Sequence, residues 1–139
     1  MMMVHALALC VALLAPPPTA ASAFCTCAGP TTDAAAIRHN DAVFEGRVLR
    51  SRRVRYRDGF RGIVYTFAVS RWRKGTPSRT VDVVTGEGGG DCGVEFDRGR
   101  THTVYASRNG AGRLATDICS GPYLPAPAPP PPLSNPRDR

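Results

Sequence analysis

The sequence predicts an all-β domain with little α content: five strands in a closed or nearly closed barrel, one short helix and disulfide staples. Apolar and polar residues alternate with a period of two along five stretches between residues 42 and 118. Turn signals separate these stretches, and no helical pattern lies between them, which argues against parallel βαβ units. Four cysteines remain after a predicted export signal, an even number that is typical of a disulfide framework.

Residues 1–23 are predicted to be a signal peptide. An apolar run that begins at Ala6 is broken by three prolines, and residues 21–23 have the small-residue spacing of a cleavage site. Cleavage at this site makes Phe24 the first mature residue, while Cys25 is the alternative start. The run is too short to span a bilayer, so we expect a secreted protein without stable membrane insertion.

One short helix is predicted at the start of the domain. Thr31 or Thr32 caps it, Asp33 lies in its first turn, three alanines and Ile37 follow, and Asn40 is a plausible stop.

The first two strands are predicted to form a long hairpin. From Ala42 the period changes to two, with Phe44, Gly46 and Val48 on one face and Glu45 and Arg47 on the other, and the strand continues towards Tyr56. Gly46 marks a bend or a close backbone contact. A turn at residues 57–59 leads to the clearest alternation in the chain, residues 63–69, which ends at a second turn over residues 72–77.

Three shorter strands complete the predicted barrel. They cover residues 80–85, 101–106 and 114–118. A glycine-rich loop, residues 86–90, follows the first of them, and the turn at 109–112 precedes the last. The loop lacks the lysine and the following helix of a phosphate-binding loop. The domain is predicted to cover residues 24–123, and residues 124–139 form a proline-rich tail without a fold of its own.

The four mature cysteines are Cys25, Cys27, Cys92 and Cys119. An even number in a small exported chain favours disulfides over metal ligands. A zinc site is the alternative, but it usually takes a second closely spaced pair, which Cys92 and Cys119 do not form. Four cysteines allow three pairings, and a bridge between Cys25 and Cys27 is the least favourable because its ring is strained.

The net charge is +7, and nearly all the basic residues are arginines. A cationic surface suits acidic partners such as an acidic polysaccharide. A set of arginines is predicted to lie on one side of the first hairpin and to bind polyanions: Arg47, Arg53, Arg55, Arg57 and the nearby Arg61. The alternative is a solvated, well-charged surface without such a ligand. Only two histidines and no free thiol remain in the mature chain, so neither an enzyme nor a cofactor is expected.

Several motifs, in this order and spacing, resemble the N-terminal domain of the tissue inhibitors of metalloproteinases and the wider netrin-like group. They are Cys25-Thr26-Cys27, Phe44-Glu45-Gly46-Arg47-Val48, Trp72-Arg73-Lys74-Gly75, Cys92-Gly93 with Phe96, Tyr105-Ala106, and the stretch from Leu114 to Cys119. They cover nearly the whole mature chain to about Tyr123. The resemblance implies a five-stranded OB-type barrel with bridges Cys25–Cys92 and Cys27–Cys119.

The resemblance also implies a secreted inhibitor of a zinc metalloproteinase. In that family the amine and the carbonyl of the N-terminal cysteine, here Cys25, chelate the catalytic zinc of the enzyme, which keeps one position open for water. Thr26 would enter the main specificity pocket, and Cys27 and Ala28 would continue this contact. Gly90 and Asp91 would form a second contact edge.

Three features differ from the family pattern. Phe24 precedes the cysteine, Gly29 is an additional residue, and two bridges are available where the animal inhibitor domain has three. With Phe24 first, the nitrogen of Cys25 is an amide, whose lone pair is delocalised and does not chelate. Two other hypotheses therefore remain: a netrin-like binding module that uses its arginines on an acidic ligand, and a Cys25-Thr26-Cys27 segment that only staples the fold.

Overall fold

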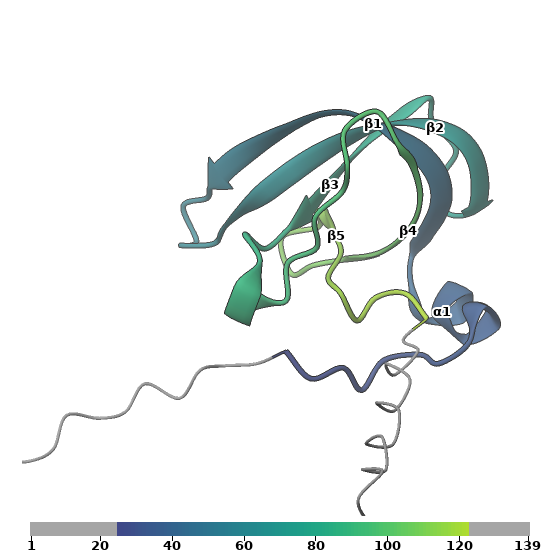
Figure 1. Ribbon diagram of the computed structural model, residues 1–139, viewed down its shortest axis with the longest axis horizontal. Helices are drawn as coiled ribbons and strands as arrows, with labels where there is room; N and C mark the ends of the chain where they lie inside the picture. Colours follow the sequence, from purple (N-terminus) through teal and green to yellow (C-terminus); the bar gives the residue numbers. More distant parts are fainter. Residues whose placement is uncertain (1–24, 123–139) are drawn as a thin grey trace, which may run out of the picture.

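The computed structural model describes residues 25–122, and its five strands close into a barrel (Figure 1). The order around the ring is β1-β2-β3-β5-β4, and every neighbouring pair is antiparallel except β3 and β5. The predicted all-β class with an OB-fold-like barrel is therefore confirmed. The predicted signal peptide, Phe24 and the predicted tail lie outside the described residues.

Helix α1 spans Asp33–His39 and has the predicted caps. The Thr32 hydroxyl accepts the Ala35 N–H at 3.2 Å, and the backbone N–H of Asn40 donates to the Ala36 carbonyl as the helix ends. Lys74 Nζ donates to the carbonyls of Ile37 and Arg38 at 3.0 and 3.1 Å, which satisfies two acceptors of the last turn.

Strands β1 (Ala42–Arg55) and β2 (Arg61–Lys74) form the long hairpin that the alternation predicts. At the turn between them, the N–H of Tyr56 donates to the Phe60 carbonyl at 2.9 Å, and the Phe60 N–H donates to Asp58 Oδ1 at 3.0 Å. Gly59 takes a φ of +87°, which is favourable only for glycine, so the predicted turn is confirmed.

Strand β1 contains a β-bulge at Leu49 that the alternation does not predict. Val48 pairs with Phe67 and Arg50 pairs with Thr66, so Leu49 has no partner on β2. Because side chains alternate between faces, one extra residue moves every later side chain of the strand to the other face. Beyond Leu49, each side chain of β1 therefore lies on the opposite face of the sheet from the one expected for a regular strand.

Strands β3 (Thr80–Thr85) and β4 (Thr101–Arg108) match the predicted positions, and one turn of 3-10 helix, η1 (Gly89–Asp91), lies between them. Strand β5 covers only Leu114–Ala115, so the prediction of a strand to residue 118 is wrong. The chain leaves the sheet because the Asp117 carboxylate accepts the Cys119 N–H at 2.8 Å and forms a turn.

The core consists of inward side chains from four strands: Phe44, Val48, Tyr65, Phe67, Val83, Val104 and Ala106. The ring of Phe96, from the loop before β4, packs edge-on against Tyr65 and Phe67 with centroids 5.2 Å apart. A Cβ on Gly46 would lie 3.1 Å from the side chains of Phe44 and Phe67, so the predicted close contact at this glycine is confirmed.

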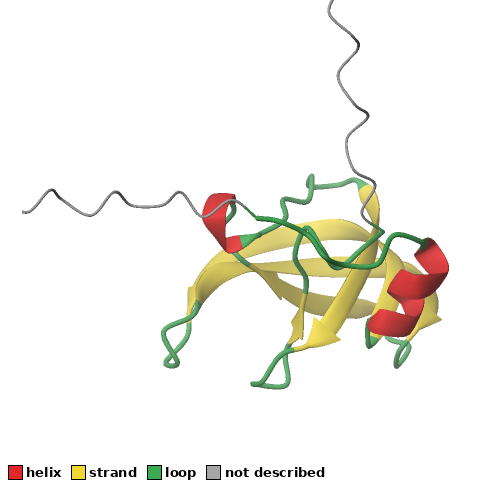
Figure 2. Ribbon diagram, turned by 90° about the horizontal axis from the view of Figure 1, so that it is seen from below, coloured by secondary structure: helices red, strands yellow, loops and turns green. Residues whose placement is uncertain are grey.

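The segment before α1 runs across one end of the barrel, from η1 to the helix (Figure 2). Within residues 25–122, no helix is long and apolar enough to cross a membrane.

Candidate functional site

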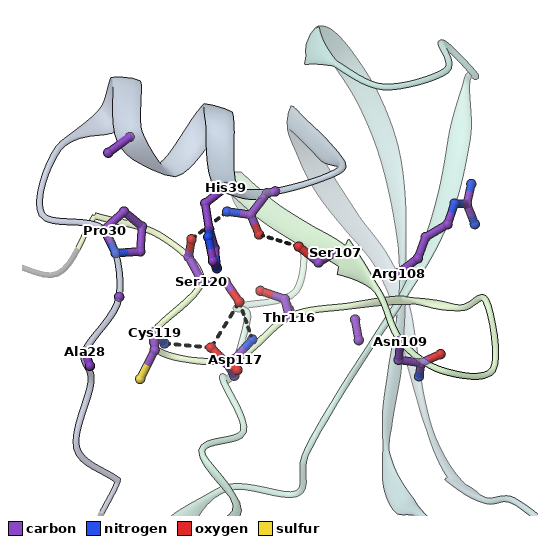
Figure 3. A pocket seen from close by; sticks show the side chains of 14 residues that line it. Ala28, Pro30, His39, Ser107, Arg108, Asn109, Thr116, Asp117, Cys119 and Ser120 are labelled. Carbon is purple, nitrogen blue, oxygen red and sulfur yellow. Dashed lines mark hydrogen bonds between the residues drawn. The ribbon is translucent and has the colours of Figure 1, made fainter.

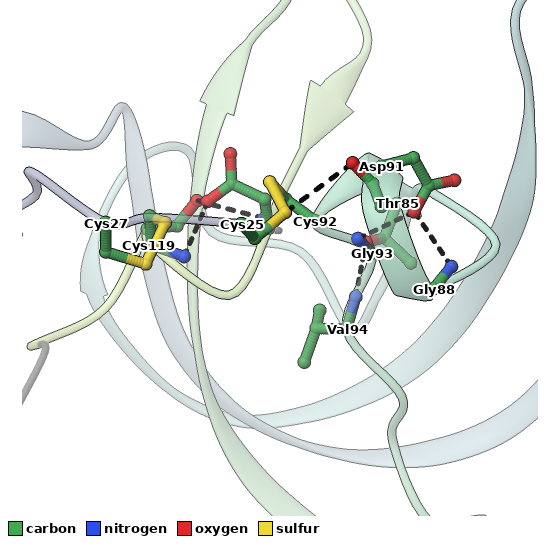
Figure 4. The surroundings of a disulfide bond; sticks show 12 residues. Cys25, Cys27, Thr85, Gly88, Asp91, Cys92, Gly93, Val94 and Cys119 are labelled. Carbon is green, nitrogen blue, oxygen red and sulfur yellow. Dashed lines mark hydrogen bonds between the residues drawn. A yellow bond between two sulfur atoms is a disulfide. The ribbon is translucent and has the colours of Figure 1, made fainter. Parts of the chain in front are cut away.

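Two disulfides fix the N-terminal segment to distant parts of the chain. Cys25 is bonded to Cys92, just after η1, and Cys27 to Cys119, in the turn after β5 (Figure 4). The Cα atoms of the two pairs are 5.4 and 5.1 Å apart. These are the pairings that the family resemblance implies. The two anchors lie two residues apart, so the peptide between them has little freedom.

Burial alternates along this segment. Cys25 and Cys27 are half-buried, whereas Thr26 and Ala28 are exposed. The Cys25 sulfur also lies 3.7 Å from the carbonyl oxygen of Gly90, an exposed residue of η1. We refer to residues 25–28 together with Gly90 as the N-terminal edge. It presents the Thr26 and Ala28 side chains and the Gly90 backbone at one surface.

The Asp91 carboxylate holds the glycine-rich loop beside this edge. It accepts the backbone N–H groups of Glu87, Gly88 and Gly93 at 2.6, 2.9 and 3.0 Å. The hydrogen bond from Gly93, followed by those from Glu87 and Gly88, lowers the pKa of the Asp91 carboxyl below its usual value. The predicted contact residue Asp91 therefore lies next to Gly90, but its carboxylate is directed into its own loop.

The backbone of this loop is unusual at the bridged cysteine. Cys92 takes a φ of +59°, the only positive φ among the described residues other than glycine. For a residue with a side chain this left-handed conformation costs about 1 kcal/mol. Gly93 comes next, and a Cβ there would lie 2.4 Å from the Gly86 carbonyl oxygen, so the loop folds back on itself only with glycine at this position.

The other half of the N-terminal segment borders a surface hollow of 690 Å³ between α1, the end of β4 and the turn at Cys119 (Figure 3). Gly29 packs against that turn so closely that a Cβ would lie 2.4 Å from the Cys119 carbonyl oxygen. The residue that is additional to the family pattern is thus the one that lets the segment approach Cys119.

Asn40 joins three elements at this hollow. Its Nδ2 donates to the carbonyls of Ala36 and Ser120, both at 2.8 Å, and its Oδ1 accepts the Ser107 hydroxyl at 3.2 Å. The residue is only 2% exposed. The sequence indicated a helix stop here, but it gave no sign that the side chain links α1, β4 and the C-terminal turn.

A surface network ties α1 to the barrel. Arg73 donates two hydrogen bonds to the Asp33 carboxylate, at 3.0 and 2.5 Å, and the Tyr105 hydroxyl donates to the same carboxylate. The Arg73 hydrogen bond, and then that of Tyr105, lowers the pKa of Asp33. Burial, and then the bond to Asp33, raises the pKa of Tyr105. The helix that follows the N-terminal edge is thereby fixed in place.

The predicted arginine set does not lie on one face. Arg47 pairs with Ala68, whereas Arg53 pairs with Ile63 and Arg55 with Arg61, and the bulge at Leu49 places the two groups on opposite faces of the sheet. Arg57 belongs to the turn beyond β1. The prediction of a single arginine face is therefore wrong. Arg53 and Arg61 also share one ion-pair partner, Glu87, at 3.7 Å each.

Within residues 25–122, no group of three or more His, Cys, Asp or Glu side chains is placed to hold a metal ion. Of the two histidines of this part, His102 packs its ring on Phe96 with the centroids 5.2 Å apart, and the exposed His39 borders the hollow. Neither a protein-family model nor a curated protein matches this chain.

Proposed function

We propose that this protein is a secreted, TIMP-like inhibitor of a zinc metalloproteinase, and that it acts through the N-terminal edge. The observation that carries the proposal is the exposed Thr26 between two bridged cysteines, with the Gly90 carbonyl oxygen 3.7 Å from the Cys25 sulfur. An edge that is ordered before binding loses little conformational entropy when it enters an enzyme's cleft.

In this proposal the residues of the N-terminal edge and the neighbouring Asp91 have different roles. A free amine and the carbonyl of Cys25 would take the open coordination position of the enzyme's zinc and displace its water. The Thr26 side chain would enter the specificity pocket, and Ala28 and Gly90 would contact the rim. Asp91 acts indirectly, because its carboxylate holds the loop that carries Gly90. The Cys25 sulfur takes no part in chelation, since it is bonded to Cys92.

The test compares two forms of the full mature chain, one that begins at Phe24 and one at Cys25, against a panel of secreted zinc proteases. We expect strong inhibition by the Cys25 form only, because an amide nitrogen does not chelate. Thr26→Gly in that form should weaken inhibition about tenfold or more, as the loss of a buried anchor does. Thr76→Gly, at an exposed position in the turn after β2, is the matched control.

Equal potency of the two forms would show that the terminus does not reach the zinc. If neither form inhibits any protease, the second candidate function becomes the better one: a netrin-like module that binds an acidic ligand. What favours this candidate is the cationic hairpin, in which Arg53, Arg55 and Arg61 share a face. Within residues 25–122, Glu87 is the only ion-pair partner of these three arginines.

A further inference from the structure

A groove on the barrel, whose residues are all distinct from those of the N-terminal edge, has the composition of a ligand site. It has a volume of 340 Å³, within the range of roughly 300–1,000 Å³ that is usual for small-ligand pockets. Its apolar lining comes from Val64 of β2, Val84 of β3 and Leu114 of β5. Val64 and Val84 are each only 3% exposed, so they form a fixed floor rather than a mobile surface.

Three arginines from different elements surround this floor: Arg52 of β1, Arg108 of β4 and Arg113 of the β4–β5 connection. Two of them are held in position. Arg108 Nη1 donates to the Gly112 carbonyl at 2.8 Å, and the Arg113 guanidinium lies 3.5 Å from the centroid of the Tyr56 ring.

Arg52 completes the set and owes its place to the bulge at Leu49. It pairs with Val64, so its side chain is on the face of the groove, whereas Arg53 and Arg55 are on the other face. Arg52 is exposed, and its guanidinium forms no ion pair within residues 25–122. A guanidinium binds carboxylate and sulfate groups through two parallel N–H donors, so Arg52 is available for an anionic group of a ligand.

One carboxylate lies among these arginines, and it limits the kinds of ligand that the groove can bind. Asp82 lines the groove, and its Oδ1 accepts the Thr66 hydroxyl at 2.6 Å, which leaves Oδ2 for a further donor. A carboxylate accepts hydrogen bonds from the ring hydroxyls of a sugar, which the internal nucleotides of a DNA strand lack. A second carboxylate, Asp58, has its Oδ2 3.4 Å from Arg113 Nη1. The one aromatic ring in the groove, Tyr56, has a face covered by Arg113, so it offers less stacking area to a nucleobase.

We propose that this groove binds an acidic sugar, a uronate or a sulfated ring, as one unit of an acidic polysaccharide. The anionic group would pair with Arg52 and Arg108, the ring C–H groups would lie on Val64 and Val84, and a ring hydroxyl would donate to Asp82. The site does not depend on the proposed protease inhibition, because none of its residues belongs to the N-terminal edge.

The test titrates the full mature protein with a sulfated, uronate-containing disaccharide, followed by calorimetry and by the methyl NMR signals of the groove. We expect the Val64, Val84 and Leu114 methyls to shift. Arg52→Gln should weaken binding about tenfold, the effect of losing one charge-assisted hydrogen bond. Arg98→Gln is the matched control: the same change of charge at an exposed position in the turn before β4, outside the groove. It should change the affinity less than about twofold, as a screened distant charge does.

A second variant separates sugar from nucleic acid. Asp82→Asn removes a repulsive charge for either anionic ligand, but only the disaccharide has ring hydroxyls that donate to this acceptor. The variant should therefore weaken binding of the disaccharide and strengthen binding of an oligothymidylate. Equal effects of the Arg52 and Arg98 variants, unshifted groove methyls, or stronger disaccharide binding by the Asp82 variant would each overturn the proposal. So would tighter binding of the oligothymidylate than of the disaccharide by the parent protein.

Discussion

Two regions of this barrel, the stapled end and the hairpin end, are held by different kinds of interaction. At the stapled end, two disulfides and the buried amide of Asn40 connect the N-terminal segment, the helix and the C-terminal turn. At the hairpin end, the β1–β2 hairpin is tied to Glu87, in the glycine-rich loop beside the N-terminal edge, by ion pairs from Arg53 and Arg61, each at 3.7 Å. The Arg53 side chain there is 82% exposed.

The two kinds of interaction serve different purposes: the first fixes atomic positions, and the second supplies charge. Covalent bonds and buried hydrogen bonds fix atoms in one position and are insensitive to salt, whereas exposed ion pairs contribute little and are screened. An edge that must fit a cleft needs the first kind of support. A surface that attracts polyanions needs charge but little geometric precision, so the second kind is sufficient.

The largest expected effect comes from breaking the stapled end. Replacing Cys27 and Cys119 together by serine opens a loop of 92 residues and should lower the free energy of unfolding by roughly 4 kcal/mol, because the unfolded chain gains freedom. Urea unfolding of the variant and the parent, both without reductant, measures this loss. A loss below about 1 kcal/mol would show that the barrel does not need this staple.

A smaller effect is expected from the polar clamp at the same end. Asn40→Ala removes three side-chain hydrogen bonds from a site that is 2% exposed, so acceptors lose their partners without access to water. We expect a loss of about 2–3 kcal/mol in unfolding free energy. Ser107→Ala, which removes only the partner of Oδ1, is the control and should cost about 1 kcal/mol. Similar losses of unfolding free energy for the two variants would contradict the role of Asn40 as a link between the three elements.

The smallest effect is expected at the hairpin end. Glu87→Gln removes the partner of Arg53 and Arg61, and it should change the free energy of unfolding by less than about 0.5 kcal/mol, because exposed pairs are weak. Arg53 and Arg61 then have no ion-pair partner within residues 25–122. The variant should therefore leave a heparin column at higher salt than the parent does. Unchanged elution would indicate that the hairpin arginines do not contribute to polyanion binding.

The features that the sequence predicted correctly are those with a local signal. Alternation located the strands, Thr32 marked the start of the helix, and residues 57–59 marked the hairpin turn. The Cys25-Thr26-Cys27 pattern located the stapled segment, because closely spaced cysteines with distant partners constrain the chain between them.

The features that the sequence did not reveal depend on contacts between distant residues. The pattern around Leu49 gives no sign of a register shift, because Val48 and Val54 have the same phase on either side of the stretch between them. The end of β5 is decided by the turn at Asp117, which competes with the sheet for the same residues. Asn40 meets Ser120 across 80 positions of sequence, and the groove collects residues from all five strands. Local sequence patterns do not specify such contacts between distant residues.

The long separation of the bridged cysteines has a consequence for biosynthesis. Cys119 is made 92 residues after Cys27, which at about 5–20 residues per second is a delay of roughly 5–20 s. Cys25 can find Cys92 earlier, but β5, which closes the ring, also comes late in the chain. During synthesis the first residues of the domain therefore have no disulfide bridge until their partner cysteines have been made. The N-terminal segment is therefore completed late, only after Cys119 has been made and can be oxidised.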